Sequence, residues 1–428
     1  MKSSWIHKIS IISLSLVLFV LAGSTAAYAA PKTPSDSAQT LKVVYKNKHL
    51  FDENAFNEQF PGVKIQSVYW DGKSSLSGLI AKQSPDVVML DKAEYKQLAK
   101  GTMFTELGSL IQRDQYDTAT IYPGLVDALK SDGKLYGLSP FFSTQSIFYN
   151  IDLFKKYGVP LPQDGMSWEE ILKLAAKFPT KGSANTRVWG LDYPLDSYAY
   201  LLNNVSTSEG LARHDAARSK AAMNTAAWKK AYAMTVNAIK SGTIEGSNEN
   251  GYDKNSFLMG RSAMWVDFSS TNALRDLTAD KSALAKYKPF KVGIAAGPSD
   301  SKNPKITRNV TLPAILTIPA ASTHKDLAWD FIKFYNSEEY AESKSDKLGD
   351  YAPSRMDHSR EYDGYSTEAF YKLKPNLDLP DESASGMLFN VQYAKIVNSE
   401  VKQALGGKKS LDQSLLAIHT QVQKILKK

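Results

Sequence analysis

Apolar and polar residues follow two different repeating patterns along the chain. Short apolar runs with turn residues on either side predict strands at 41–45, 63–68 and 86–90. The segments between them, 52–60 and 76–83, repeat apolar residues at helical spacing. Strands that alternate with helices in this way predict βαβ units and a largely parallel sheet.

Further along the chain the pattern is mostly helical. Trp168 begins an amphipathic segment that continues to residue 178, and Ser167 and Glu170 occupy the two positions of a capping box at its start. Other segments with a helical pattern are 196–203, 221–241, 326–335 and 411–426, whereas 290–296 and 312–318 have strand character. The charged, tyrosine-rich stretch 336–385 has no pattern that assigns it.

The first 30 residues have the features of a secretory leader. Two lysines accompany an apolar run over 9–22, and small residues of the kind a signal peptidase reads follow at 27–29. A retained membrane anchor is the alternative, but the run is shorter than the roughly 20 residues that span a bilayer. We therefore expect 1–30 to be a cleaved signal peptide and 31–40 a disordered N-terminal tail.

Composition narrows the range of chemistry. A length of 428 residues exceeds what one core usually serves, so two lobes are expected. The absence of cysteine excludes disulfides, thiolate metal sites, a cysteine nucleophile and a lipid-modified N-terminal cysteine. The net charge of +8 is modest for this size and gives no reason to expect nucleic acid as a partner.

Sequence motifs of common catalytic centres are missing. The six histidines form no HExxH pair, and no GxSxG, P-loop or GxGxxG string occurs. We therefore expect no metal and no cofactor, and a binding protein rather than an enzyme. The 44 acidic residues nevertheless leave open a pair of carboxylates for glycoside hydrolysis.

Six blocks spread over most of the chain carry a family resemblance. They are SPDVVMLD at 84–91, DGKLYGLSP at 132–140, IFYNIDLFKKYG at 147–158, MSWEE at 166–170, FLMGRSAM at 257–264 and AWDFIKFYNSEE at 328–339. In this order they resemble bacterial extracellular solute-binding proteins of family 1. The similarity is to the carbohydrate-binding branch that includes maltose-binding protein, whose members serve ABC importers.

The resemblance implies an α/β fold of two lobes, the periplasmic-binding-protein (Venus-flytrap) fold. Each lobe would be a mostly parallel sheet flanked by helices, and each would be discontinuous because the chain crosses between lobes more than once. The expected parts are lobe 1 at 41–140 plus about 297–340, lobe 2 at about 145–290 plus 345–428, and hinges near 139–144 and 291–297.

The resemblance also implies a ligand site at strand ends that face a crevice between the lobes. The candidate ligand-binding residues are Asn47, Lys48, Asp91, Ser143, Thr144, Tyr193, Asp196, Tyr198, Asp267, Ser270, Arg308, Asn309, Phe389 and Tyr393. Two alternatives stay open: Asp91 as a solvated loop residue, and core packing for Phe389 and Tyr393, which share one helix face.

One departure from the maltose-binding pattern bears on the ligand. Those relatives carry a stacking tryptophan after the strand that contains Met264, and this chain lacks it there. Trp265 comes too early, and strand alternation places it on the opposite face from Met264. The departure weakens the expectation of a maltodextrin without affecting the expected scaffold.

The implied function is an exported receptor that captures a carbohydrate, expected to be an oligosaccharide, between two lobes. Its partners would be that carbohydrate and the membrane permease subunits of an ABC importer, with the receptor itself a monomer. We expect a periplasmic, extracellular or cell-surface location without a lipid anchor. The alternatives are a secreted carbohydrate-active enzyme with two carboxylates, and a ligand-sensing partner of a membrane signalling protein.

Overall fold

The structure is a computed structural model of the chain. It describes residues 39–46, 50, 52–182, 187–193, 197–245, 255–268, 289–344, 351–356, 361–362, 364–378 and 386–427. The predicted signal peptide and four candidate site residues, Asn47, Lys48, Asp196 and Ser270, lie outside these ranges. Among the described helices, none combines the length and the apolar character that crossing a bilayer requires.

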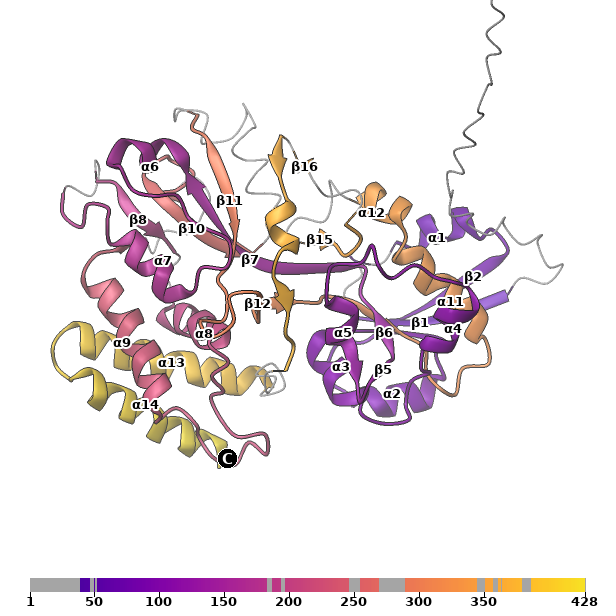
Figure 1. Cartoon of the computed structure of the whole chain (residues 1–428). Coiled ribbons are helices and arrows are strands. Elements are labelled where there is room, and N and C mark those ends of the chain that lie inside the picture. The colour runs from indigo at the N-terminus through magenta and orange to yellow at the C-terminus, as the bar shows by residue number, and fades with distance from the viewer. Residues whose placement is uncertain are drawn as a thin grey trace, which may run out of the picture.

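The elements form two lobes joined by a long strand, as Figure 1 shows. The first lobe contains a five-stranded sheet in the order β2-β1-β3-β14-β6. Its strands are β1 (Gln39–Tyr45), β2 (Val63–Tyr69), β3 (Val87–Leu90), β6 (Gly137–Leu138) and β14 (Ile315–Thr317). Its helices are α1 (Glu53–Gln59), α2 (Leu76–Gln83), α3 (Lys92–Leu98), α4 (Gly108–Arg113), α5 (Leu125–Leu129), α11 (Lys325–Tyr335) and α12 (Glu338–Lys344).

The second lobe is built on a sheet in the order β11-β7-β10-β8-β9. The strands are β7 (Phe141–Asn150), β8 (Trp189–Asp192), β9 (Ile244–Glu245), β10 (Ser262–Phe268) and β11 (Val292–Ala296). The helices are α6 (Ile151–Tyr157), α7 (Trp168–Ala175), α8 (Tyr198–Ser208), α9 (Ala226–Lys240), α13 (Gly386–Leu405) and α14 (Leu411–Leu426). In Figure 1 the last two helices lie beneath α8 and α9, on the outer side of this lobe.

The two-lobe α/β fold agrees with the expectation, but each sheet is mixed rather than mostly parallel. Strand β1 runs parallel to β2 and β3, whereas β14 is antiparallel to β3 and β6. In the second sheet β8 is parallel to β9 and β10, while β7 is antiparallel to β10 and β11. The antiparallel pairs involve β7, where the chain enters the second lobe, and β14, where it returns to the first. Neither strand follows a helix that crosses over from a neighbouring parallel strand.

Strand β7 is the structural link between the lobes (Figure 1). Its first half pairs with β15 (Ala352–Pro353) and β13 (Val310–Thr311), and its second half lies in the second sheet. Strand β11 pairs with β7 from Val292 to Ala296, so 292–296 belong to the second sheet, and the chain reaches β14 through β13. We call Asn309–Thr311 the crossing segment.

Several short strands and one 3-10 helix lie between the lobes or at their edges. They are β4 (Lys130–Ser131), β5 (Lys134–Leu135), β12 (Ile306–Thr307), β16 (Glu361–Tyr362), β17 (Tyr365–Ser366), η3 (Glu368–Tyr371) and β18 (Lys374–Pro375). At the start of the chain, β1 already includes Gln39 and Thr40, because both pair with β2; the predicted tail would have included them.

The local predictions around α7 are confirmed. Ser167 caps the helix, its hydroxyl accepting a hydrogen bond from the Glu170 amide, and the Glu170 carboxylate accepts one from the Ser167 amide at 2.8 Å. The apolar face of α7, which includes Trp168 and Ile171, is buried in the second lobe. Met264 packs in the same cluster, whereas Trp265 packs in a different one, so the two side chains do lie on opposite faces of β10.

Candidate functional site

A stacked pair of tyrosines lies beside the end of β8 in the second lobe. Tyr193 directly follows β8 and is buried, and its ring stacks on Tyr200 of α8 at 5.8 Å and 28°. Trp168 packs edge-on against Tyr193 at 5.5 Å. Tyr200 is 39% exposed, so the pair reaches the surface of the second lobe through Tyr200, while Tyr193 lies buried between Tyr200 and Trp168.

Polar groups surround the Tyr193 hydroxyl. Asn204 Nδ2 donates to it at 2.6 Å, and Gln145 of β7 forms a further side-chain hydrogen bond with Tyr193. Burial raises the pKa of Tyr193 well above its usual value, and the nearby Tyr200 and Asp267 add to the shift. The hydroxyl is therefore neutral at physiological pH, and its hydrogen bonds hold the Tyr193 ring in place.

The ends of β10 and β7 place an acidic group beside this pair. Asp267 lies opposite Ser146 in the antiparallel register, and its Oδ1 accepts a hydrogen bond from the Phe268 amide at 2.8 Å. Within the described part of the chain, Gln145 Oε1 and Ser146 Oγ are buried without a hydrogen-bond partner. Because the two residues are consecutive on β7, their side chains point to opposite faces of the sheet, and Gln145 shares the face of Ile147, which packs in the same cluster as Tyr193.

The crossing segment lies next to these groups. Asn309 Nδ2 donates to Ser208 Oγ at 2.6 Å and to the Asn204 carbonyl at 3.2 Å. The next residue, Val310, pairs with Thr144 of β7, and its carbonyl accepts a hydrogen bond from Lys92 Nζ at 3.1 Å. The crossing segment thus contacts α8 of the second lobe and α3 of the first.

The first-lobe side of this region is charged. Lys46, at the end of β1, forms ion pairs with Asp91 at 3.1 Å and with Glu94 at 2.8 Å, and its ammonium lies 5.3 Å from the Trp70 ring. Asp91 also caps α3, since its Oδ1 accepts a hydrogen bond from the Glu94 amide at 2.9 Å. These groups sit at the carboxyl ends of parallel strands, where α/β proteins commonly bind ligands.

The other predicted ligand-binding residues that the structure describes lie partly near the crossing segment and partly away from it. Ser143 and Thr144 are buried on β7 opposite β13, and Tyr198 begins α8. Arg308 forms an ion pair with Asp300 at 3.1 Å. The structure therefore brings Tyr193, Asp267, Asn309, Ser143 and Thr144 to one region around the crossing segment.

Phe389 and Tyr393 lie elsewhere, in the helical layer of α13. Their rings stack at 6.3 Å and 13°, as their spacing of four residues predicts, and both are buried. The Arg213 guanidinium lies 4.5 Å from the Tyr393 ring and 5.2 Å from the Phe389 ring. These contacts agree with the alternative of core packing.

Four described residues of this region were not among the sequence candidates: Lys46, Gln145, Tyr200 and Asn204. Gln145 directly follows the candidates Ser143 and Thr144, so the alternation of β7 was a usable signal for it. Tyr200 and Asn204 are four residues apart on α8 and share a face. Nothing in the local sequence, however, indicated that this face meets Tyr193.

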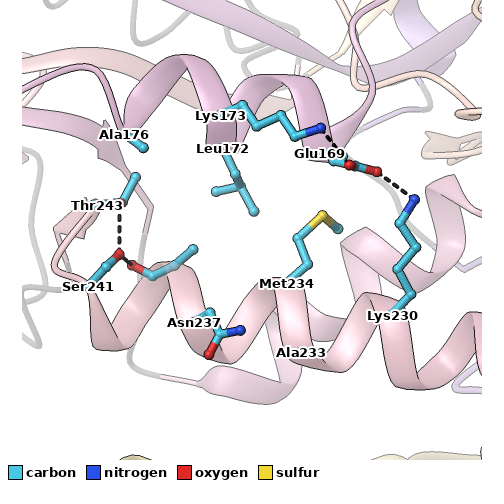
Figure 2. A pocket seen from close by; sticks show the side chains of 11 residues that line it. Glu169, Leu172, Lys173, Ala176, Lys230, Ala233, Met234, Asn237, Ser241 and Thr243 are labelled. Carbon is cyan, nitrogen blue, oxygen red and sulfur yellow. Dashed lines mark hydrogen bonds and ion pairs between the residues drawn. The ribbon is translucent and has the colours of Figure 1, made fainter.

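A separate groove lies between α7 and α9, shown in Figure 2. Its volume is about 490 Å³, Leu172 and Met234 point into it, and Ala233 also lines it. At the rim, Glu169 forms ion pairs with Lys173 at 2.7 Å and with Lys230 at 2.6 Å. A solute rich in hydroxyls would lose hydrogen bonds against this lining, so we place the candidate site at the crossing segment instead.

Within the described ranges, no group of three or more histidine, cysteine, aspartate or glutamate side chains is arranged to hold a metal ion. The region around the crossing segment instead combines a stacked tyrosine pair that is partly exposed, hydrogen-bonding groups and a strand shared by two lobes. This combination defines a two-lobe binding protein with its candidate site where the lobes join.

Comparison with known families agrees with this class. The model of the family described as bacterial extracellular solute-binding protein matches residues 27–342. The chain belongs to this family, and its membership confirms the resemblance that the sequence blocks indicated.

The curated relatives are binding proteins. The mannitol-binding protein of Pseudomonas aeruginosa is 28% identical over 55% of this chain and 52% of its own length. The arabinooligosaccharide-binding protein of Bacillus subtilis is 25% identical over 39% of this chain and 40% of its own length. The chain thus spans about half the length of these two relatives or less. The sn-glycerol-3-phosphate-binding periplasmic protein UgpB of Brucella melitensis is 24% identical, covering 84% of this chain and 85% of that protein.

Solved structures share the fold. The sugar-binding protein MalE of Xanthomonas citri has a TM-score of 0.66 with 16% identity, covering 91% of this chain and 98% of that one. A sugar transporter protein of Rhizobium etli in an open conformation has a TM-score of 0.63 with 22% identity, covering 90% and 99%. At these identities the likeness concerns the two-lobe architecture alone.

Proposed function

We propose that the protein is an exported receptor that binds a carbohydrate at the crossing segment and delivers it to an ABC importer. The observation that carries the proposal is the stacked Tyr193–Tyr200 pair with Asp267 and Gln145 beside it. Sugars present apolar C–H faces and hydroxyl edges, so an aromatic face next to carboxylate and amide groups matches both.

The charges of the region favour a neutral carbohydrate over a phosphorylated one. Lys46 is engaged by Asp91 and Glu94, and Arg308 is engaged by Asp300. A phosphate group would have to compete with those carboxylates, while Asp267 would repel it. The relatives are named for ligands of both classes, mannitol and sn-glycerol-3-phosphate, so the charges of this site support the choice between them.

We infer that the lobes move about the strands that join them. The division near 139–144 fits the first half of β7, whose partners β13 and β15 come from outside the second sheet. The second division, expected near 291–297, would then lie beyond β11, at the crossing segment. A sugar that contacts both lobes would stabilise a closed form by its higher affinity for that form, and the permease subunits would recognise it.

Isothermal titration calorimetry of the purified mature chain tests this proposal. The panel consists of mannitol, arabinose oligosaccharides, maltose and sn-glycerol-3-phosphate, with small-angle scattering of each mixture. We expect a neutral sugar or polyol to bind, to reduce the radius of gyration and to leave the mass at that of a monomer. Binding of the phosphorylated solute alone, or of none of the panel, would contradict the proposal.

The enzyme alternative is tested with the same panel. The proposal expects the oligosaccharide to be recovered unchanged after prolonged incubation, as judged by chromatography. Release of shorter sugars that disappears in an Asp267→Asn variant would favour a hydrolase with a catalytic carboxylate instead.

A further inference from the structure

Asn204 joins the Tyr193–Tyr200 pair to the interior of the second lobe. The residue lies on α8 and is buried. Its Nδ2 donates to the Tyr193 hydroxyl at 2.6 Å and to the Tyr200 carbonyl at 3.0 Å. One amide group therefore fixes the Tyr193 hydroxyl and the backbone of Tyr200 relative to each other.

Asn204 also contacts the crossing segment, through its backbone carbonyl. The Asn204 carbonyl accepts a hydrogen bond from Asn309 Nδ2 at 3.2 Å, and Asn309 Nδ2 also donates to Ser208 Oγ at 2.6 Å. Asn309 is buried, so both bonds are shielded from water. The sequence predicted Asn309 as a ligand contact, but in the structure its side-chain amide is already used within the protein.

The residue after Asn309, Val310, contacts both β7 and the first lobe. Val310 pairs with Thr144 on β7, and its carbonyl accepts a hydrogen bond from Lys92 of α3. A path of hydrogen bonds and the covalent bonds within Asn204 and between Asn309 and Val310 thus leads from the aromatic pair through α8 to β7 and to the first lobe.

We propose that Asn204 and Asn309 are positioning residues that couple the Tyr193–Tyr200 pair to the crossing segment. A ligand that reorients Tyr200 would shift α8, and Asn309 would transmit that shift to the strands about which the lobes move. The reverse also holds, because coupling between two sites is reciprocal. The inference rests on the proposed function for its ligand, but the coupling itself is a property of the unliganded protein.

Hydrogen exchange of the unliganded protein tests the coupling without any sugar. Asn204→Leu keeps the side-chain volume but removes the donor to Tyr193. We expect amides of 309–312 to exchange at least fivefold faster in this variant than in the wild type. The matched control is Asn203→Leu, because Asn203 is the neighbouring asparagine on α8 and its Oδ1 makes no hydrogen bond within the described chain.

Asn309→Asp gives the reciprocal measurement. The aspartate keeps the shape of the side chain but cannot donate to Ser208 or to the Asn204 carbonyl. We expect faster exchange around residues 198–204 and, for a sugar that binds the wild type, a reduced change in radius of gyration on binding. The Asn204→Leu and Asn309→Asp effects on affinity should combine to less than their product, because both interrupt one path.

Hydrogen exchange and sugar titration together distinguish a failure of the coupling from a failure of the proposed sugar binding. Unchanged exchange at 309–312 in Asn204→Leu, or the same acceleration in Asn203→Leu, would overturn the coupling even if sugars bind. Accelerated exchange limited to the Asn204→Leu variant, with no panel member bound by the wild type, would leave the coupling standing and contradict the proposed function.

Discussion

Lys92 Nζ lies 3.1 Å from the carbonyl oxygen of Val310, so the first turn of α3 is tied directly to the crossing segment. Lys92→Met keeps the aliphatic stem and removes the ammonium. We expect a loss of about 1.5–3 kcal/mol in the free energy of unfolding, since a hydrogen bond from a charged group is lost at a partly buried place. Urea denaturation followed by fluorescence measures it.

The control for this variant is Lys96→Met on the same helix. Lys96 pairs at 3.1 Å with Asp378, whose side chain is 81% exposed. Exposed ion pairs contribute about 0–1 kcal/mol, so the control should change stability less than Lys92→Met does. Equal effects of the two substitutions would contradict the structural role of the Lys92–Val310 contact.

Tyr200 supplies the exposed ring of the aromatic pair, and Tyr200→Ala should weaken sugar binding. Aromatic contacts of this kind contribute about 0.5–1.5 kcal/mol beyond area burial, which corresponds to roughly a 2- to 12-fold increase in Kd. Calorimetric titration measures the change. Tyr157→Ala serves as the control, because Tyr157 is similarly exposed but packs against Phe178, away from the crossing segment. Similar Kd values for both variants would remove Tyr200 from the site.

Asp192 should make the stability of the second lobe depend on pH. Its Oδ2 accepts hydrogen bonds from Ser256 Oγ at 2.8 Å and from the Phe257 amide at 3.0 Å. Burial is the largest cause that raises the pKa of Asp192, to about 6. The folded form therefore holds the proton more tightly than the unfolded chain does, and stability falls as pH rises from about 4 to about 6.

Asp192→Asn removes this titration while its amide oxygen still accepts both hydrogen bonds. The variant should gain stability relative to the wild type between pH 4.5 and pH 7, by about 2 kcal/mol for a shift of this size. Chemical denaturation of both proteins at the two pH values measures the gain. A stability difference that is the same at both pH values would show that Asp192 does not titrate in this range.

Gly190 is required by the close packing of β8 on α7. A Cβ at this position would lie 2.0 Å from the carbonyl oxygen of Ala175, which is backbone and cannot move away without displacing the helix. Gly190→Ala should lower the free energy of unfolding by more than about 3 kcal/mol, at the severe end for overpacking. The control is Gly62→Ala, where nothing lies within 4 Å of the added atom. A melting temperature equal to that of the control would contradict this packing.

Several elements were readable from the sequence because their causes are local. The predicted helices 76–83 and 411–426 coincide with α2 and α14, and the capping box at Ser167 forms as expected. Strand alternation correctly separated Met264 from Trp265. In each case, the spacing of apolar residues or the chemistry of a cap acts over a few neighbouring residues.

The site was only partly readable. Tyr193, Asp267 and the Ser143–Thr144 pair follow or occupy strands, and their role as ligand contacts stays a prediction of the family pattern. Nothing in the sequence near Asn309 indicated that α8 would accept hydrogen bonds from its side-chain amide. Tyr200 and Asn204 were missed because a helix face shows that it is buried but not which neighbour buries it.

The sequence by itself determined the family, the two-lobe α/β class and the bounds of individual elements such as α2 and α14, because these follow from apolar spacing, turn residues and blocks shared with relatives. Only the tertiary structure decided which strand ends meet. Asn204 and Asn309 are 105 residues apart, and Lys92 and Val310 are 218 apart. Such contacts depend on how the chain crosses between lobes, and that path is fixed by the packing of whole sheets and helices rather than by any local pattern.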